Sequence, residues 1–155
     1  MNDQAIYFKY SSDLGQTWKP HTCPIDTPRA VWGPVLHWDS ATSKLWLFYS
    51  ASGTPEARPG YHGDNSSYPG GDIRVMTSDN AGASWSLPRT VLSYEARHNV
   101  SKVTANKVSV TSNGTWLLPF WSNNHHDGVD LGVSCPGVLR STDQGNHYFS
   151  YTIHT

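Results

Sequence analysis

An eight-residue pattern occurs three times in this chain of 155 residues, and it constrains the fold more than any other feature. The pattern reads SSDLGQTW at 11–18, SDNAGASW at 78–85 and, more loosely, STDQGNHY at 141–148. Each copy begins with serine, has Asp or Asn at its third position and glycine at its fifth, and ends on an aromatic residue. The copies recur about every 65 residues, a spacing typical of a repeating supersecondary unit.

The segments around the pattern predict short strands. Residues 35–51 and 108–123 each read as an apolar strand, a polar turn and a second apolar strand. A third short strand, at 72–77 or 137–141, leads into the pattern, and a fourth strand follows it. Between the second and third strands of each unit lies a polar excursion rich in Gly and Pro, at 52–72 and 124–136.

Four antiparallel strands in a repeated unit are typical of a β-propeller blade, so we expect an all-β fold built from four-stranded blades. No segment with a helical period competes with this interpretation. Residues 1–155 then form a single domain that is only part of a propeller. We expect the end of one blade at about 5–25, a second blade at 30–93 and a third at 101–155.

Charge and composition exclude some kinds of partner. The chain has 11 basic and 12 acidic residues and no basic run, so we expect no nucleic-acid partner, and no stretch is long and apolar enough for a membrane span. Three sequons, at Asn65, Asn99 and Asn113, are candidate glycosylation sites and favour a secreted or lysosomal parent protein. The N-terminal MNDQAIYFKY has no apolar signal core, so the localisation stays open.

The repeated pattern itself is better explained as a turn than as a catalytic site. A short carboxylate or amide and a serine hydroxyl can accept hydrogen bonds from nearby backbone amides, and glycine supplies a positive φ. The second copy has Asn80, which can replace a carboxylate in a turn but not as an acid or base. The aromatic residues are expected to begin the next strand and to pack between blades. The predicted structural residues are Ser11, Asp13, Gly15, Trp18, Ser78, Asn80, Gly82, Trp85, Ser141, Asp143 and Gly145.

These copies resemble the Asp-box, or BNR repeat, of the sialidase (neuraminidase) superfamily. WGPVLHWDSATSKLWLFYSASG is similar to one sialidase blade, and KVTANKVSVTSNGTWLLPFWSN is similar to the next. The resemblance implies a six-bladed propeller when complete, a carbohydrate partner such as a sialoglycoconjugate, and the glycoside hydrolase activity of an exo-alpha-sialidase without a cofactor or metal.

The catalytic residues implied by the resemblance are not matched in this chain. Sialidases use an arginine triad, an acid/base aspartate and a tyrosine–glutamate pair, and in the family order these stand on either side of the blades found here. The other candidates, Arg29, Arg74, Arg97, Arg140 and the neighbours Tyr94 and Glu95, do not occupy matching positions. We therefore expect an inactive fragment whose partners include the remaining blades. A non-catalytic carbohydrate-binding propeller and a polysaccharide lyase on the same scaffold are the alternatives.

The resemblance places a secondary part of a sugar site on this chain. Its candidate residues are Glu56, Trp121 and Asn123, for which an exposed loop position or packing between blades is the alternative. Asn106 and Lys107 are further candidates if they point into the central cleft, and a charged strand edge is the alternative for them.

Three other features give weaker signals. His125, His126 and Asp127, like His62 and Asp64, are expected in solvated loops and not in a metal site, because adjacent residues of an extended strand face opposite sides. Cys23 and Cys135 leave both a disulfide and free thiols open.

Overall fold

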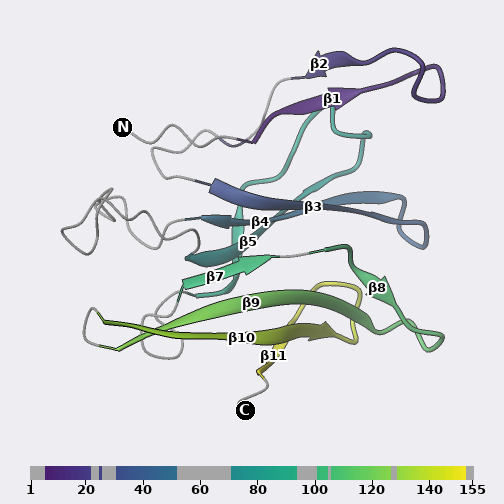
Figure 1. The fold of residues 1–155 in the computed structure, drawn as a ribbon. Helices are drawn as coiled ribbons and strands as arrows, with labels where there is room; N and C mark the ends of the chain where they lie inside the picture. The colour runs from purple at the N-terminus through teal and green to yellow at the C-terminus, as the bar shows by residue number, and fades with distance from the viewer. Residues whose placement is uncertain are drawn as a thin grey trace.

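The computed structural model describes residues 6–21, 25, 31–51, 71–93, 101–104, 106–126 and 129–152, with no side-chain description for 101, 123–126 and 129–134. Over these ranges the regular structure consists of eleven strands in three antiparallel sheets, which stack as successive layers (Figure 1). The described part contains no helix that could span a membrane. The predicted all-β, antiparallel fold is confirmed.

The first sheet is a two-stranded hairpin. Strand β1 (Phe8–Tyr10) pairs with β2 (Lys19–His21), and Phe8 lies opposite His21. The first copy of the repeated pattern is the turn between them.

The second sheet has four strands in sequence order. They are β3 (Val31–Asp39), β4 (Lys44–Ala51), β5 (Asp72–Ser78) and β6 (Arg89–Leu92). Asp39 fixes the tight β3–β4 turn, because its carboxylate accepts hydrogen bonds from the Ala41 amide (3.1 Å) and from the Thr42 hydroxyl. The second copy of the pattern connects β5 to β6.

The third sheet repeats this arrangement with a broken first strand. Its elements are β7 (Ser101–Thr104), β8 (Ser109–Val110), β9 (Trp116–His126), β10 (Val129–Ser141) and β11 (Phe149–Thr152). Both β7 and β8 pair with β9, so they share one edge, which is interrupted near Asn106. The third copy connects β10 to β11.

The predicted polar excursion at 124–136 is wrong. Strand β9 continues to His126 and β10 begins at Val129, so most of this segment is a β-ribbon, with an irregular register between Asp130 and Ser134. Backbone groups make the ladder, and polar side chains do not prevent it. The sequence held a signal for this hairpin in Asp127-Gly128, a pair typical of two-residue turns between strands.

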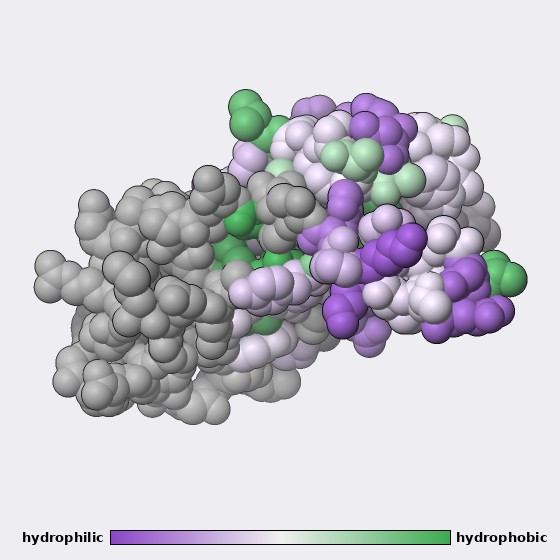
Figure 2. Space-filling model, turned by 90° about the horizontal axis from the view of Figure 1, so that it is seen from above, coloured by the Kyte–Doolittle hydropathy of each residue, from purple (hydrophilic) through white to green (hydrophobic). Residues whose placement is uncertain are grey.

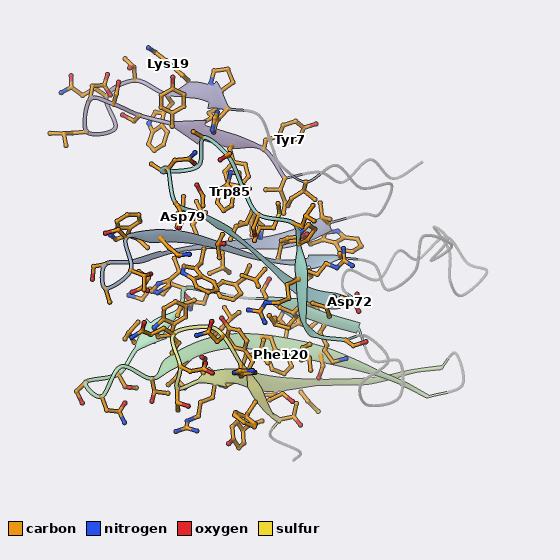
Figure 3. The ribbon with its side chains drawn as sticks, turned by 180° about the vertical axis from the view of Figure 1, so that it is seen from behind. Tyr7, Lys19, Asp72, Asp79, Trp85 and Phe120 are labelled. Atoms are coloured by element: carbon orange, nitrogen blue, oxygen red, sulfur yellow. The ribbon has the colours of Figure 1, made fainter. Side chains whose placement is uncertain are left out.

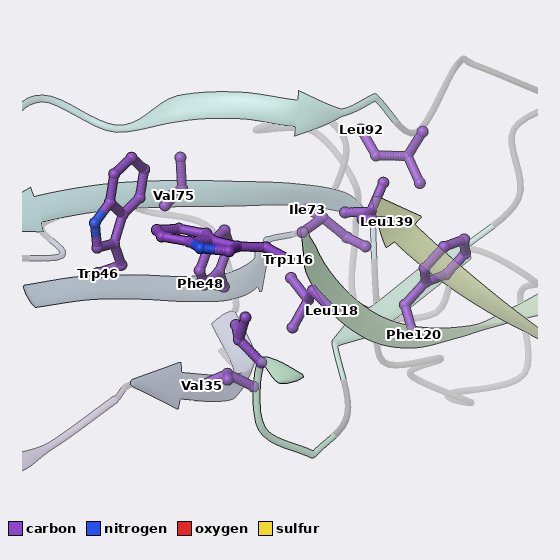
Figure 4. Packing of buried hydrophobic residues seen from close by; sticks show 11 residues of the cluster. Val35, Trp46, Phe48, Ile73, Val75, Leu92, Trp116, Leu118, Phe120 and Leu139 are labelled. Carbon is purple, nitrogen blue, oxygen red and sulfur yellow. The ribbon is translucent and has the colours of Figure 1, made fainter. Parts of the chain in front are cut away.

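Two hydrophobic clusters hold the three sheets together. Alternation along β4 sends Trp46 and Phe48 toward the third sheet and Leu47 and Tyr49 toward the first, so both faces of the second sheet are buried. Figure 4 shows the larger cluster, in which Trp46 meets Trp116 edge to face with ring centroids 5.1 Å apart. In Figure 3, Trp85 lies between the first and second sheets and Phe120 between the second and third.

The first strands of the second and third sheets make a close polar contact. The Thr104 hydroxyl donates to the carbonyl of Gly33, and the Thr104 amide donates to the Ser50 hydroxyl at 2.9 Å. Gly33 has φ 56°, and a Cβ there would lie 2.6 Å from the Thr104 carbonyl oxygen. Glycine is therefore required where β3 approaches β7.

We expect Gly33→Ala to lower the free energy of unfolding by about 1–3 kcal/mol, because the added methyl group must push two backbones apart. Urea denaturation followed by circular dichroism measures the change. Gly114→Ala is the matched control, since Gly114 also has a positive φ (80°) but nothing lies within 4 Å of its Cβ position. Equal losses in the two variants would contradict the steric explanation.

Candidate functional site

The first copy of the pattern is a turn locked by its own side chains. The Ser11 hydroxyl donates to Asp13 Oδ1 (2.6 Å) and accepts from the Gly15 amide (2.8 Å). The Asp13 carboxylate accepts from the amide of Thr17 (2.9 Å) and from its hydroxyl. Gly15 has φ 87°, which only glycine adopts easily.

The other two copies form the same lock with different chemistry. In the second, Asn80 Oδ1 accepts from the Ser84 amide (2.8 Å), and its Nδ2 donates to the Ser84 hydroxyl (2.8 Å). In the third, Asp143 Oδ1 accepts from the His147 amide (2.9 Å), and Asp143 Oδ2 lies 2.6 Å from His147 Nδ1. The third copy thus keeps the hydrogen bonds of its serine and aspartate despite its looser sequence, but its Tyr148 hydroxyl is buried without a hydrogen-bond partner, unlike the indoles of the first two copies.

The third copy contains serine, aspartate and histidine, yet it is not a catalytic triad. A triad needs histidine between the serine and the carboxylate, so that imidazole can take the serine proton. Here the carboxylate stands in the middle, because the Ser141 hydroxyl donates to Asp143 Oδ1 at 2.8 Å. Ser141 is also fully buried.

The prediction that the aromatic residues begin the next strand is wrong. Strand β2 begins at Lys19 and β6 at Arg89, after Trp18 and Trp85 respectively. Each indole folds back over its own turn, since Trp18 Nε1 donates to the Gly15 carbonyl (3.1 Å) and Trp85 Nε1 to that of Gly82 (3.0 Å).

The prediction that these aromatic residues pack between sheets is confirmed for Trp85 and is wrong for Trp18 within the described structure. Trp85 stacks on Phe8 of the first sheet with ring centroids 5.9 Å apart. Trp18 is 59% exposed.

The pattern also joins neighbouring sheets, a role that sequence reasoning missed. His21 of β2 lies with Nε2 2.7 Å from the carbonyl oxygen of Gly82, so Nε2 carries the proton that this oxygen accepts. Arg89 of β6 donates from Nη2 to the Gly145 carbonyl (2.7 Å) and from Nη1 to that of Asn146 (3.2 Å). We call these two contacts the carbonyl clasps. In each, the outer strand of one sheet holds the turn of the next.

Charged groups lie at the opposite end of the sheets. Asp72 opens β5, and Figure 3 shows it at the far end of that strand from Asp79. The buried Lys102 of β7 donates from Nζ to the Ser93 carbonyl (3.0 Å), and its own carbonyl accepts from the Gly71 amide (3.2 Å). Sequence reasoning missed Asp72 and Lys102; a lysine within the short strand SKVT was the available signal.

The predicted sugar-contacting residues lie in two places. Asn106 and Lys107 are exposed at the break between β7 and β8, where the Lys107 amide donates to Asn106 Oδ1 (2.9 Å). Trp121 is half-buried on β9 opposite Val103, with Asn123 two residues further along the strand. In the described structure no hydrogen bond or ion pair joins Trp121 to Asn106 or Lys107. Glu56 lies outside the described residues.

The three described arginines lie on different sheet faces. Arg74 and Arg89 occupy successive rungs of the β5–β6 ladder, opposite Thr90 and Val75, and so point to opposite faces of the second sheet. Arg140 is next to the inward Leu139 on β10 and so points to the outer face of the third sheet. Arg74 Nε is 3.8 Å from Asp72 Oδ2. The other candidates, Arg29, Arg97, Tyr94 and Glu95, are outside the described residues.

Asn113 is the one sequon asparagine within the described ranges. It is exposed, and its Oδ1 accepts from the Thr111 hydroxyl (2.6 Å) and the Thr115 amide (3.2 Å). Asn65 and Asn99 lie outside the described residues.

The remaining sequence features are only partly described. Cys135 is buried as a free thiol, and Cys23 is not described. His125 and His126 belong to strand β9 and not to a loop, whereas Asp127, His62 and Asp64 are not described. The side chains that are described form no group of three metal-binding residues.

Comparison with known proteins identifies the family. The model of the BNR repeat-like domain matches residues 1–150, so the chain belongs to this family. A search of the curated proteins finds no match.

Solved sialidase structures share the fold. The Hadza microbial sialidase Hz136 superposes with a TM-score of 0.69 at 18% identity, covering 94% of this chain and 30% of the sialidase. The Trypanosoma rangeli sialidase in complex with sialic acid gives 0.58 at 18% identity, covering 92% of this chain and 24% of that protein. A mutant of that enzyme displaying trans-sialidase activity gives 0.59 at 19% identity, with the same coverage. The predicted BNR repeat is confirmed by the family match, the solved sialidases show that the fold is shared, and this chain spans 24–30% of their length.

The carboxylate locks predict acid sensitivity. Hydrogen bonds from Ser11 and Thr17 lower the pKa of Asp13 from 3.8 to about 2, and those from the amide and ring of His147 lower the pKa of Asp143 to about 2. The folded state therefore binds fewer protons, so both locks contribute stability above about pH 4 and lose it as the pH falls toward 2. The melting temperature of the wild-type protein should fall more steeply over this range than that of Asp13→Asn/Asp143→Asn, which copies the second lock.

Asp79→Asn is the control for this experiment. Asp79 faces Lys44 at the surface (3.1 Å) and accepts no hydrogen bond of the turn in the described structure. It should keep the wild-type slope, and a double variant with that same slope would contradict the prediction.

Removing a carbonyl clasp should weaken the joint between sheets. Arg89→Met keeps the aliphatic stem and removes both donors, so we expect a loss of about 1 kcal/mol in the free energy of unfolding. Urea denaturation measures the change. Lys9→Met, at an exposed position of β1, should change stability by less than half as much. An Arg89→Met variant as stable as the wild-type protein would show that the clasp contributes nothing.

Proposed function

We propose that this chain is part of a sialidase-like glycoside hydrolase and contributes the secondary part of its sugar site. The arrangement of the sheets supports this proposal. All three pattern turns lie at one end, where Ser78 pairs with Leu45 and Ser141 with Trp116. The carbonyl clasps hold the sheets together there, which leaves the opposite strand ends to form a shared rim.

The rim contains the groups that suit a polar ligand. Asp72 and Lys102 lie at the strand ends away from the pattern turns, and Trp121 and Asn123 lie on β9 just before it continues into the β9–β10 ribbon. Lys102 is buried and fixed to the Ser93 carbonyl, so its role is to position the strand ends and not to touch a sugar. Trp121 is half-buried and follows the inward Phe120 on β9, so it points to the outer face of the third sheet and supplies there an aromatic face of the kind that packs on a sugar ring.

The positions of the three described arginines support the proposal that this chain alone does not hydrolyse a sialoside. A carboxylate clamp needs guanidinium groups that converge on one ligand. Arg89 is committed to two backbone carbonyls, and Arg74 and Arg140 lie on other sheet faces. The same features fit a carbohydrate-binding propeller without catalysis, so hydrolysis and binding are tested separately.

A fluorogenic sialoside tests hydrolysis. The 155-residue chain should release no fluorophore above the buffer rate, and robust turnover would overturn the proposal that the site is incomplete.

Saturation-transfer NMR with sialyllactose tests binding. We expect transfer to the sialic acid protons, reduced severalfold by Trp121→Ala, with lactose as the ligand control. Trp38→Ala is the matched protein control, because Trp38 is 52% exposed on β3, away from the rim. Equal transfer from sialyllactose and lactose would argue against sialic acid as the ligand.

A further inference from the structure

The first pattern turn carries a contact surface with no partner sheet in the described structure. Its Gly15 carbonyl accepts the Trp18 indole proton but no donor from another sheet, unlike the carbonyls of Gly82 and Gly145 in the two carbonyl clasps. Trp18, the counterpart of the stacked Trp85, is 59% exposed beside it. We call Gly15 and Trp18 the head surface.

The outer face of the third sheet carries the matching half of this contact. The pairing of the last two strands in each sheet identifies the matching half. In the first two sheets, the clasp donor lies opposite the residue that stands three positions before the serine of the pattern. His21 pairs with Phe8, and Arg89 pairs with Val75. In the third sheet the same position is Val138, and its partner is Tyr151.

Tyr151 has the chemistry of a clasp donor. It is 55% exposed, and its phenol hydroxyl can donate to a carbonyl as His21 and Arg89 do. Pro119 lies beside Val138 and Tyr151 on the same face of the third sheet, because it pairs with Val138 across the β9–β10 ladder. Phe48 pairs with Val75 in the same way in the second sheet. In the second sheet, the Phe48 ring packs against Tyr148 of the third pattern turn, with ring centroids 6.0 Å apart. We call Pro119, Val138 and Tyr151 the tail surface.

We infer that this chain self-associates head to tail, so that the head surface of one copy docks on the tail surface of another. Trp18 then packs on Pro119 and Val138 of the second copy, and the second copy's Tyr151 hydroxyl donates to the Gly15 carbonyl. A second copy is the occupant because one chain carries both halves of a contact that it already makes twice internally. This inference concerns association of the 155-residue chain and does not depend on whether its rim binds a sugar.

The chemistry of the side that carries the head surface indicates a reversible contact. Figure 2 looks onto the side of the first sheet and shows a mixture of hydrophilic and intermediate residues with small hydrophobic patches. Such a mixed surface is typical of non-obligate interfaces. Because the two halves differ, the contact is heterologous and produces dimers and longer chains or rings.

Sedimentation of two blocked variants tests the inference. Trp18→Lys blocks the head, and Tyr151→Lys blocks the tail; both residues are more than half exposed, so the fold should survive. The wild-type protein should show a mass that rises with concentration above the 17.2 kDa of one chain. Each variant alone should stay monomeric, whereas an equimolar mixture should form dimers, because it restores one intact head and one intact tail.

Two further variants sharpen the test. Leu87→Lys, at a position 89% exposed outside both surfaces, should associate like the wild-type protein. Tyr151→Phe, which removes only the hydroxyl, should raise the dissociation constant roughly fivefold.

Several results would overturn the inference. A monomeric wild-type protein would mean that both surfaces serve other sheets of a longer chain. Dimerisation by either blocked variant alone would indicate a symmetric contact, and a mixture that stays monomeric would exclude the head-to-tail pairing. Recovery of dimers in the mixture would also prove that both variants are folded.

Discussion

The fold depends on the carbonyl of the glycine in each pattern turn. Glycine takes a positive φ because the serine hydroxyl holds its amide, and this conformation presents the carbonyl oxygen outward. In the first two copies, the tryptophan of the same turn donates a hydrogen bond to this oxygen. In the last two copies, His21 or Arg89 of the preceding sheet donates a hydrogen bond to it. One oxygen thus connects the local turn to the stacking of sheets, which explains why a repeated structural motif sits where blades meet.

The two ends of the stacked sheets therefore have different roles. At the turn end, hydrogen bonds and aromatic contacts fix the spacing of the sheets. At the other end, the buried Lys102 ties the start of β7 to the end of β6, and Gly71 ties the start of β5 to β7. A ligand site at that end therefore rests on strands whose positions are set from both ends.

Much of the architecture follows from sequence patterns. Alternation of apolar residues and the repeated turn predict the all-β fold, and Asn80 shows from sequence alone that the motif is structural. The ribbon of β9 and β10 was missed because its polar residues resemble a loop, although backbone pairing needs no apolar side chains. The carbonyl clasps were missed for a different reason. His21 and Arg89 occupy equivalent rungs but differ in chemistry and in their distance from the preceding aromatic residue, so only the register of the strands reveals them.

The clasps also have a direction along the chain. In both, the donor precedes the acceptor: His21 comes before Gly82, and Arg89 before Gly145. During synthesis, the second and third pattern turns therefore leave the ribosome after the outer strand that will hold each of them is complete. Sheets can then be added one at a time onto a finished neighbour, which suits folding that proceeds from the N-terminus as the chain grows.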